Sequence, residues 1–404
     1  MCARSYTDLD SRSRHIEGEI TVSQRVQQIP ISPTIAISNL VSQLKAEGVD
    51  IVSFSLGEPD FNTPSNVVDA TKASLDRGFT HYTPSTGIPA LRKAIADKAK
   101  RDNGLDVKPE NVLVTPTKQA LFLIALAYID PGDEVILADP AWVTYDSLIR
   151  LAGGVPVYVH TRYEDNFVIN PAAVEAAVTP KTSMIILNTP SNPTGCVQPE
   201  NVIRAIADIA VRHGIMVVSD EIYEALVYEG KHFSIATCPG MEQLALTVSG
   251  FSKSYAMTGW RIGWIIASAE NIKIINKLQS QSISCCTSFV QEGAVEALEG
   301  DQTSVRNMLD TFAKRRELMV GLVNAVPGLE CKAPMGAFYV FVKYDADMPS
   351  AVLAERLLQE AHVAVTPGSA FGPAGEGFFR LSYATSDDQI REGVSRIDRF
   401  MRSL

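Results

Sequence analysis

Between residues 182 and 221 the sequence reads as a strand, a helix and a second strand. The runs TSMIILN (182–188) and IMVVSDE (215–221) are short and apolar, and the first is rich in β-branched residues. Between them apolar residues recur at helical spacing from Pro199 to Gly214, and glycine commonly ends a helix. Such a βαβ unit requires a parallel sheet that is covered on both faces. Similar apolar runs occur at 111–117, 133–140, 155–160 and 244–250, so the sequence predicts a large α/β domain.

The C-terminal part of the chain has a different pattern. A long polar helix pattern around 302–325 precedes GAFYVFVKY (336–344), which alternates like a strand with one solvated face. Further short strands and a terminal helix from about 387 follow, which is typical of a smaller α+β domain. We therefore expect a flexible tail at 1–20, a segment at 21–56 that belongs to the small domain, a large domain at 57–305 and a small C-terminal domain at 306–404.

Composition argues against several functional classes. The net charge is −10 and no basic stripe is present, which argues against a nucleic-acid-binding protein. No run of eighteen apolar residues occurs and the first residues lack the apolar stretch of a secretory signal, so we expect neither a membrane span nor secretion. The six cysteines form no CxxC pair and are expected to be reduced thiols in a cytoplasmic protein.

Several common catalytic and binding motifs are absent. The sequence has no GxGxxG that opens a helix after a strand, no GxxxxGK[ST] and no GxSxG, which argues against dinucleotide, P-loop and α/β-hydrolase sites. The histidines show no HxxxH or HExxH spacing, so no metal site is expected. We interpret the glycine-rich stretch 368–377 as a turn between strands, and Cys285 and Cys286 as packing residues.

Polar residues instead gather where the predicted parallel strands end. Asn192 follows one strand, Asp220 and Tyr223 end or follow the next, and Lys253 and Arg261 follow a third. Each has an ordinary structural explanation by itself, such as a turn or a helix N-cap. In open α/β sheets, however, ligands bind beyond the carboxyl ends of the strands, so together these residues indicate one site.

This set of residue types is the set that pyridoxal phosphate chemistry needs. A desolvated lysine forms a Schiff base with the cofactor, and an aspartate keeps the pyridine nitrogen protonated so that the ring accepts electrons. An asparagine amide and a tyrosine hydroxyl can bind the phenolate oxygen of the ring. An arginine and the N–H groups of a helix start can bind the phosphate.

The stretch GFSKSYAMTGWRIG (250–263) contains both cations and resembles the lysine-attachment motif of the class I and II aminotransferases of fold type I. The resemblance covers about residues 22–403 and is strongest with the aspartate, prephenate and aromatic aminotransferase branch of bacteria and archaea. It implies a seven-stranded, mostly parallel sheet between helices and a smaller α+β domain. Supporting blocks are SLGEPDF (55–61), HYTPSTGIPALR (81–92), TKQAL (117–121), ADPAWVTY (138–145), NTPSNPTG (188–195), SDEIYE (219–224) and RLSYATS (380–386).

The resemblance implies a role for each matching residue. Lys253 would hold the cofactor and shuttle the proton, and Asp220 would pair with the pyridinium nitrogen. Arg380 would bind the substrate α-carboxylate in a bidentate manner, which lysine does poorly. The remaining implied contacts are Asn192 and Tyr223 on the phenolate, Trp142 on the ring face, Thr117, Lys118, Ser252 and Arg261 around the phosphate end, Tyr82 from the other subunit of a homodimer, and Gly57, Trp142 and Asn192 beside the substrate. Cis peptide bonds are implied before Pro140 and Pro193.

One stretch departs from the family pattern. Relatives usually carry a glycine pair before the lysine of KQA, where backbone N–H groups hold the phosphate, but this chain has Pro116 and Thr117. Proline has no N–H, so one phosphate donor is lost, and we expect the hydroxyl and N–H of Thr117 to compensate. Gly250 likewise stands where some relatives place a serine, and Ser252 is the nearest substitute.

Lys118 is the main indication of substrate preference. In the aspartate branch this lysine reaches the distal carboxylate of dicarboxylic substrates, and Thr34 and Ser32 could add hydrogen bonds. The resulting hypothesis is a ping-pong L-aspartate:2-oxoglutarate aminotransferase that extends to prephenate or aromatic partners. The alternatives are a lyase or an oxidase on the same scaffold and a non-catalytic binding protein that keeps the fold.

Overall fold

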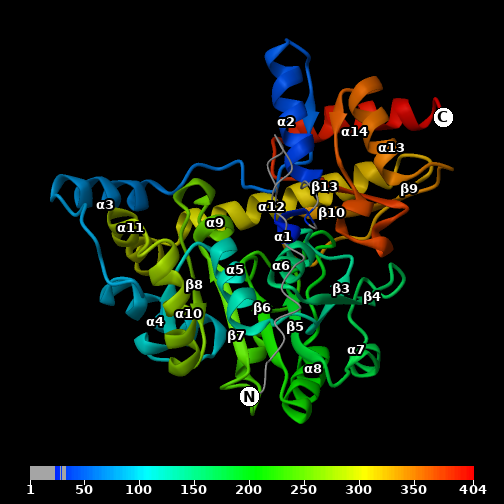
Figure 1. Ribbon diagram of the computed structural model, residues 1–404. Helices are drawn as coiled ribbons and strands as arrows, with labels where there is room; N and C mark the ends of the chain where they lie inside the picture. Colours follow the sequence, from blue (N-terminus) through cyan, green and yellow to red (C-terminus); the bar gives the residue numbers. More distant parts are fainter. Residues whose placement is uncertain (1–22, 28, 30–32) are drawn as a thin grey trace, which may run out of the picture.

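The computed structural model describes residues 23–27, 29 and 33–404 (Figure 1). The predicted tail at 1–20 and Ser32 lie outside the described residues, as does the side chain of Thr34 in helix α2 (Pro33–Ala46). Within the described residues, no helix combines the length and the apolar character that a membrane crossing needs. The cysteines of this part of the chain, Cys196, Cys238, Cys285, Cys286 and Cys331, are free thiols.

A seven-stranded sheet forms the centre of the molecule. Every neighbouring pair in it is parallel except the two pairs made by β8, which is antiparallel to both β2 and β7. The prediction of a mostly parallel sheet is therefore confirmed. Its strands, in spatial order, are β2 (Val112–Val114), β8 (Gly263–Ile266), β7 (Ala245–Gly250), β6 (Met216–Asp220), β5 (Thr182–Asn188), β3 (Glu134–Asp139) and β4 (Val155–His160).

Strand β5 shows why its sequence is a continuous apolar run. Ile185 and Leu187 pack into the core on the face covered by α7 and α8, whereas Met184 and Ile186 pack into the core on the face covered by α5, α6 and α10. Successive side chains of a strand point to opposite faces, so a strand covered on both sides needs apolar residues throughout. The covering helices are α5 (Thr117–Tyr128), α6 (Thr144–Ala152), α7 (Pro171–Ala177), α8 (Glu200–His213) and α10 (Ala269–Ser282).

Helix α8 follows directly from its sequence signals. Pro199 stands at its N-cap, and Gly214 caps its C-terminus with φ of 66°, a left-handed conformation that glycine adopts without strain. Val202, Ile206 and Ala210 lie on the buried face at helical spacing. This helix therefore covers the sheet through the face that its sequence predicts.

The remaining helices flank the sheet or lead to the C-terminal part (Figure 1). Helices α3 (Ser65–Asp76), α4 (Pro89–Asn103) and α11 (Ser288–Glu299) lie together beside the end of the sheet formed by β2, which contacts α4, and α11 contacts both α3 and α4. The short helices are α1 (Gln24–Gln27) and α9 (Phe251–Ser254), with 3₁₀ turns at Pro109–Asn111, Ile235–Thr237, Thr258–Trp260, Gly368–Phe371 and Pro373–Gly375.

The C-terminal part contains a second, four-stranded antiparallel sheet in the order β12-β13-β10-β9. Strand β1 (Val52–Ser53) pairs in parallel with β11 (Val363–Ala364), so a segment from near the N-terminus joins this part. The other elements are α12 (Thr303–Val323), β9 (Leu329–Glu330), β10 (Tyr339–Tyr344), α13 (Ser350–Glu360), β12 (Thr366–Pro367), β13 (Phe378–Ser382) and α14 (Asp387–Met401).

The expectation that strand 336–344 has one solvated face is wrong. In β10 only Lys343 is exposed. Val340 and Val342 pack into the core of the C-terminal part, while Phe341 on the other face stacks on Phe378 with ring centroids 4.9 Å apart. Aromatic residues from distant segments cover the second face, which the local alternation of the sequence does not reveal.

The cis peptide bonds expected before Pro140 and Pro193 are present, and a third precedes Pro190.

Gly263 is a test of how closely the sheet packs against the start of α5. A Cβ at this position would lie 2.4 Å from Oγ1 of Thr117 and 2.7 Å from the carbonyl oxygen of Ser249. We predict that Gly263→Ala lowers the free energy of unfolding by about 1–3 kcal/mol, measured by urea unfolding. Gly321→Ala in α12, where a Cβ meets nothing within 4 Å, is the matched control and should raise it by about 0.5–1 kcal/mol. A Gly263→Ala variant whose free energy of unfolding is unchanged, or rises as in the control, would contradict the close packing.

Candidate active site

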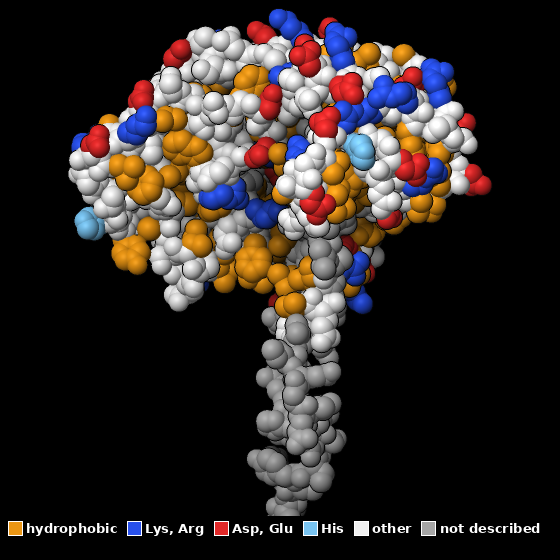
Figure 2. All heavy atoms as spheres, turned by 90° about the horizontal axis from the view of Figure 1, so that it is seen from above, with side chains coloured by type: hydrophobic (Ala, Val, Ile, Leu, Met, Phe, Trp, Pro, Cys, Tyr) orange, Lys and Arg blue, Asp and Glu red, His pale blue; other side chains and the backbone are white. Residues whose placement is uncertain are grey.

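A cavity of about 400 Å³ opens where β5, β6 and β7 end. The face of the molecule shown in Figure 2 is hollowed near its centre, where Lys and Arg side chains gather. The cavity brings together residues that are far apart in the sequence. Those that the sequence analysis had singled out and that line it are Gly57, Thr117, Lys118, Trp142, Asn192, Asp220, Tyr223, Ser252, Lys253, Arg261 and Arg380.

Lys253 lies in α9, directly after β7 ends, and lines the cavity. Its amine donates a hydrogen bond to the carbonyl oxygen of Gly57 and lies 5.8 Å from the ring centroid of Phe338. Burial lowers the pKa of Lys253 to about 8; the Glu58 carboxylate opposes this shift, while the charges of Arg380, Arg261 and Lys118 add to it. A lysine with this pKa has a substantial neutral, nucleophilic fraction near neutral pH.

Asp220 is the last residue of β6 and is 2% exposed. One carboxylate oxygen accepts a hydrogen bond from the Tyr145 hydroxyl at 2.8 Å, and the other accepts one from the Ile222 N–H at 3.2 Å. Burial raises the pKa of Asp220 to about 6, and these two hydrogen bonds oppose the shift. A buried carboxylate of this kind is well suited to a cationic N–H partner, because the partner's charge would stabilise its ionised form.

The start of α5 provides the features of an anion site. Thr117 is the first residue of this helix, and Ser252, Lys118 and Arg261 line the cavity with it. A helix N-terminus with nearby cations attracts a phosphate. Lys118 stands with its amine 4.8 Å from the ring centroid of Trp142, and burial together with the Arg261 charge lowers its pKa.

The structure shows how Pro116 and Thr117 fit into this site. The Thr117 hydroxyl donates to the carbonyl oxygen of Ser249 at 3.2 Å, so its proton is engaged within the protein. Thr117 also fills the space between Gly250 and Gly263, where a Cβ would come within 2.5 Å and 2.4 Å of its Oγ1. The expectation that the hydroxyl and N–H of Thr117 compensate for the donor lost at Pro116 stays a prediction.

Arg380 is held in place on several sides. It lies in β13, is 3% exposed, and its guanidinium donates to Oδ1 of Asn192 and to the carbonyl oxygen of Ser55, both at 2.8 Å. The guanidinium carbon stands 4.4 Å from the ring centroid of Tyr339. Arg380 is therefore not an ordinary strand residue on a solvent-exposed face. A buried arginine at a cavity, with no carboxylate among these partners, is suited to bind a carboxylate from a ligand.

Three residues that were predicted from the sequence, Tyr82, Thr34 and Ser32, do not line this cavity or lie outside what the structure describes. Tyr82 is 92% exposed and is not among the residues that line it. The side chain of Thr34 lies outside the described residues.

Several residues of the site were not predicted from the sequence. The Tyr145 hydroxyl donates a hydrogen bond to the Asp220 carboxylate, and the hydroxyls of Tyr339 and Tyr223 share a hydrogen bond of 2.9 Å. The side chain of Asn188 donates to the carbonyl oxygen of Asp220 and accepts from the N–H of Asn192. Tyr145 and Asn188 stand in stretches that the resemblance had marked, so their polar atoms at strand or helix ends were an available signal. Tyr339 sits inside an apolar strand and gave no such signal.

The residues present fit pyridoxal phosphate. Lys253 offers an amine of lowered pKa, Asp220 a buried carboxylate, and the start of α5 with Arg261 an anion site, all within one cavity. These are the groups that an aldehyde, a pyridine nitrogen and a phosphate on one molecule require.

Comparison with known proteins agrees with this geometry. The family model for aminotransferases of class I and II matches residues 49–397. A probable aspartate/prephenate aminotransferase from Aquifex aeolicus is 42% identical over 392 residues, which cover 95% of this chain and 99% of that protein. An aspartate/prephenate aminotransferase from Thermus thermophilus is 44% identical, with coverage of 94% and 98%.

Solved structures show the same fold. The aspartate aminotransferase from Thermus thermophilus with maleate superposes with a TM-score of 0.90 at 43% identity, covering 94% of this chain and 100% of that one. The aspartate aminotransferase from Rhizobium meliloti gives a TM-score of 0.91 at 37% identity, with coverage of 95% and 99%. The chain therefore belongs to the class I and II aminotransferases and is an enzyme of that family, which depends on pyridoxal 5'-phosphate.

Proposed function

We propose that this aminotransferase takes the amino group of L-aspartate and passes it to 2-oxoglutarate in two half-reactions. The observation that carries the proposal is the position of Lys118, which lines the cavity together with Lys253, Arg261 and Arg380 and lies beside Trp142. A dicarboxylic substrate needs two cations, one for each carboxylate. The relatives named as aspartate or aspartate/prephenate aminotransferases, and the Thermus structure with the dicarboxylate maleate, support this choice.

In this proposal each side chain has a separate task. Arg380 binds the α-carboxylate through its planar guanidinium, and Lys118 attracts the distal carboxylate at the side of Trp142. The bound cofactor supplies the electron sink that makes the substrate's α-proton acidic. Lys253 then accepts and returns that proton through its amine, because its lowered pKa keeps it partly neutral. Asp220 holds a proton at the ring nitrogen, and Asn192 and Tyr223 orient the phenolate.

A lyase or an oxidase on the same scaffold is the alternative, because the change at Pro116 and Thr117 alters the phosphate end. Incubation of the holoenzyme with aspartate alone separates them. An aminotransferase keeps the amino group, shifts the cofactor absorbance to that of its aminated form and releases oxaloacetate. A lyase or oxidase releases ammonia.

We also propose a homodimer in which Tyr82 of one subunit completes the cavity of the other. The support is its near-complete exposure, which is unusual for a large aromatic side chain, together with the family resemblance. Exposed Leu75 and Ile283 are further apolar side chains available for such an interface.

Covalent uptake of the cofactor should depend on the pKa of Lys253. Only the neutral amine reacts, so uptake of pyridoxal phosphate by the apoprotein should rise about tenfold per pH unit and level off above about pH 8. Absorbance after mixing measures the rate, and mass spectrometry after borohydride reduction locates the modified residue. Lys253→Ala, which should show no covalent uptake, is the control. A rate that continues to rise beyond pH 10 would contradict the lowered pKa.

Donor preference should separate the two cations. Lys118→Met keeps the side-chain length but removes the charge, so kcat/KM for aspartate and glutamate should fall about 5- to 50-fold while that for alanine changes little. Arg380→Lys is the matched comparison and should lower kcat/KM for all three donors, because each has an α-carboxylate. Steady-state kinetics on this panel give the result. Wild-type enzyme that prefers alanine or leucine to aspartate and glutamate would overturn the role of Lys118.

Shared active sites predict complementation between two damaged subunits. A mixture of Lys253→Ala and Tyr82→Ala chains, unfolded and refolded together, forms hybrids with one site that has both residues intact. We expect the mixture to be more active than either variant alone, with sedimentation equilibrium showing dimers throughout. Monomeric enzyme with full activity, or no gain on mixing, would refute the shared site.

A further inference from the structure

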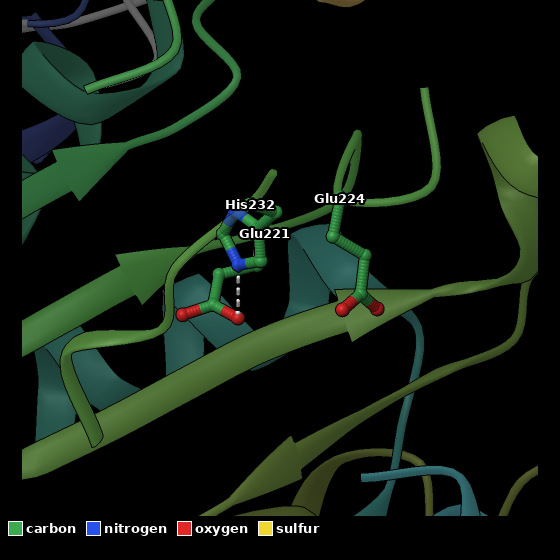
Figure 3. A group of neighbouring side chains, drawn as sticks. All are labelled: Glu221, Glu224 and His232. Carbon is green, nitrogen blue, oxygen red and sulfur yellow. Dashed lines mark hydrogen bonds and ion pairs between the residues drawn. The ribbon is translucent and has the colours of Figure 1, made fainter. Parts of the chain in front are cut away.

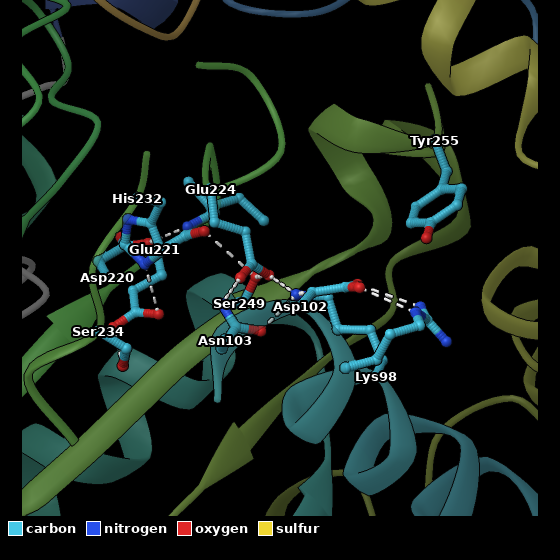
Figure 4. A network of polar contacts seen from close by, with 12 residues as sticks. Lys98, Asp102, Asn103, Asp220, Glu221, Glu224, His232, Ser234, Ser249 and Tyr255 are labelled. Atoms are coloured by element: carbon cyan, nitrogen blue, oxygen red, sulfur yellow. Dashed lines mark hydrogen bonds and ion pairs between the residues drawn. The ribbon is translucent and has the colours of Figure 1, made fainter. Parts of the chain in front are cut away.

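A buried group of charged residues, which includes Glu221, Glu224 and His232 (Figure 3), lies next to Asp220 and is not among the residues that line the cavity. Glu221 and Glu224 come from the turn after β6, His232 from the loop that follows, and Lys98 from α4 (Figure 4). Their side chains are 1%, 8%, 6% and 9% exposed, respectively. Four ionisable groups buried together are costly unless they neutralise one another, so this cluster needs an explanation.

Glu221 is surrounded by donors. Its carboxylate faces His232 Nε2 at 2.8 Å and accepts hydrogen bonds from the hydroxyls of Ser219 and Ser234 at 2.8 Å and 2.7 Å. Its backbone N–H donates to the carbonyl oxygen of Val248 in β7. The carboxylate is therefore fixed in one orientation and paired with one imidazole.

Glu224 is held in the same way. Its carboxylate lies 2.7 Å from the ammonium of Lys98, accepts a hydrogen bond from the Ser249 hydroxyl at 2.9 Å and accepts another from the side-chain amide of Asn103. Ligand atoms of Glu221, Glu224 and His232 lie within 4.8 Å of one another, a spacing that a metal ion could use. The ammonium of Lys98 and the hydroxyl donors already occupy these oxygens, which favours an internal ion-pair network.

The charges in this network balance when His232 is protonated. Burial lowers the pKa of His232, but the charge and hydrogen bond of Glu221 and the charge of Glu224 outweigh it and raise this pKa above its usual value, with Lys98 opposing them. The carboxylates of Glu221 and Glu224 then face the cations of His232 and Lys98. Asp102 lies 4.0 Å from the Lys98 ammonium but is itself paired with Arg101 at 2.8 Å, so the charges still balance.

The network contacts the segments that carry Asp220 and Lys253. Glu221 follows Asp220 in the chain, and its charge contributes to the raised pKa of that carboxyl. The Ser249 hydroxyl, which binds Glu224, also lies 3.3 Å from the carbonyl oxygen of Glu221. Ser249 lies in β7, four residues before Lys253 in α9, so the same contacts connect β6, which ends at Asp220, with the strand that leads into the helix of Lys253.

We propose that the His232–Glu221 ion pair is a positioning device that balances the charge behind Asp220 and so sets the protonation of the cofactor in the resting enzyme. The inference rests on the proposed contact between Asp220 and the ring nitrogen. Loss of His232 would leave the Glu221 carboxylate uncompensated beside that contact, and the added negative charge would favour the protonated state of the cofactor and its lysine linkage.

The test uses the holoenzyme and its visible absorbance, titrated with pH in the absence of substrate. His232→Gln should move the titration midpoint upward by about 0.5–1.5 pH units, as expected for one added buried charge on the residue that follows Asp220, in a partly screened interior. The double variant Glu221→Gln/His232→Gln restores neutrality and should return the midpoint close to the wild-type value. The dissociation constant of the cofactor is measured in parallel.

Each outcome decides the inference. An unshifted midpoint in His232→Gln, or a double variant displaced as far as the single one, would show that the pair serves packing alone and would overturn it. If His232→Gln yields too little folded protein, recovery of folded holoenzyme in the double variant supports charge balance, and its absence refutes it. Asp220→Asn tests the underlying assumption separately, since an unchanged midpoint there would contradict the role of Asp220 and not the ion pair alone.

Discussion

The parallel register between β5, β6 and β7 is the constraint on which the site depends. It pairs Asn188 with Asp220, the last residues of β5 and β6, and Asp220 with Val248 near the end of β7, so the ends of adjacent strands lie side by side. Because side chains alternate between the faces of a strand, a slip of one residue would turn Asp220 away from the cavity and Glu221 toward it. Both faces of β5 pack into apolar cores, so the same burial that stabilises the sheet also holds the strand ends that carry the chemistry.

Most of the central sheet could be predicted from the sequence because its strands are buried on both faces. The apolar runs at 133–140, 155–160, 182–188 and 244–250 correspond closely to β3, β4, β5 and β7. Strand β8 was not predicted. It is only four residues long, begins with Gly263 and directly follows the segment that contains Lys253 and Arg261. The burial of β10 also escaped prediction, because the aromatic side chains that cover it come from segments far away in the chain.

Site residues at or just after strand ends, such as Asp220 and Lys253, could be predicted from the sequence. Contacts that tertiary packing creates could not. Tyr145 meets Asp220, and Tyr339 meets Tyr223, only after separate elements have packed together. The individual roles of the cavity residues, the contribution of Tyr82 and the domain limits at 57 and 305 stay predictions.

Arg380 has a further consequence for how the protein responds to its ligands. Its guanidinium joins β13 to Asn192 in the loop after β5 and to Ser55 near the N-terminus. A carboxylate held there would act as a non-covalent cross-link among three stretches that are separated by more than a hundred residues each. These three stretches meet only in the folded protein, so a dicarboxylic ligand binds the folded state and not the unfolded chain. Such ligands should therefore stabilise the enzyme against unfolding.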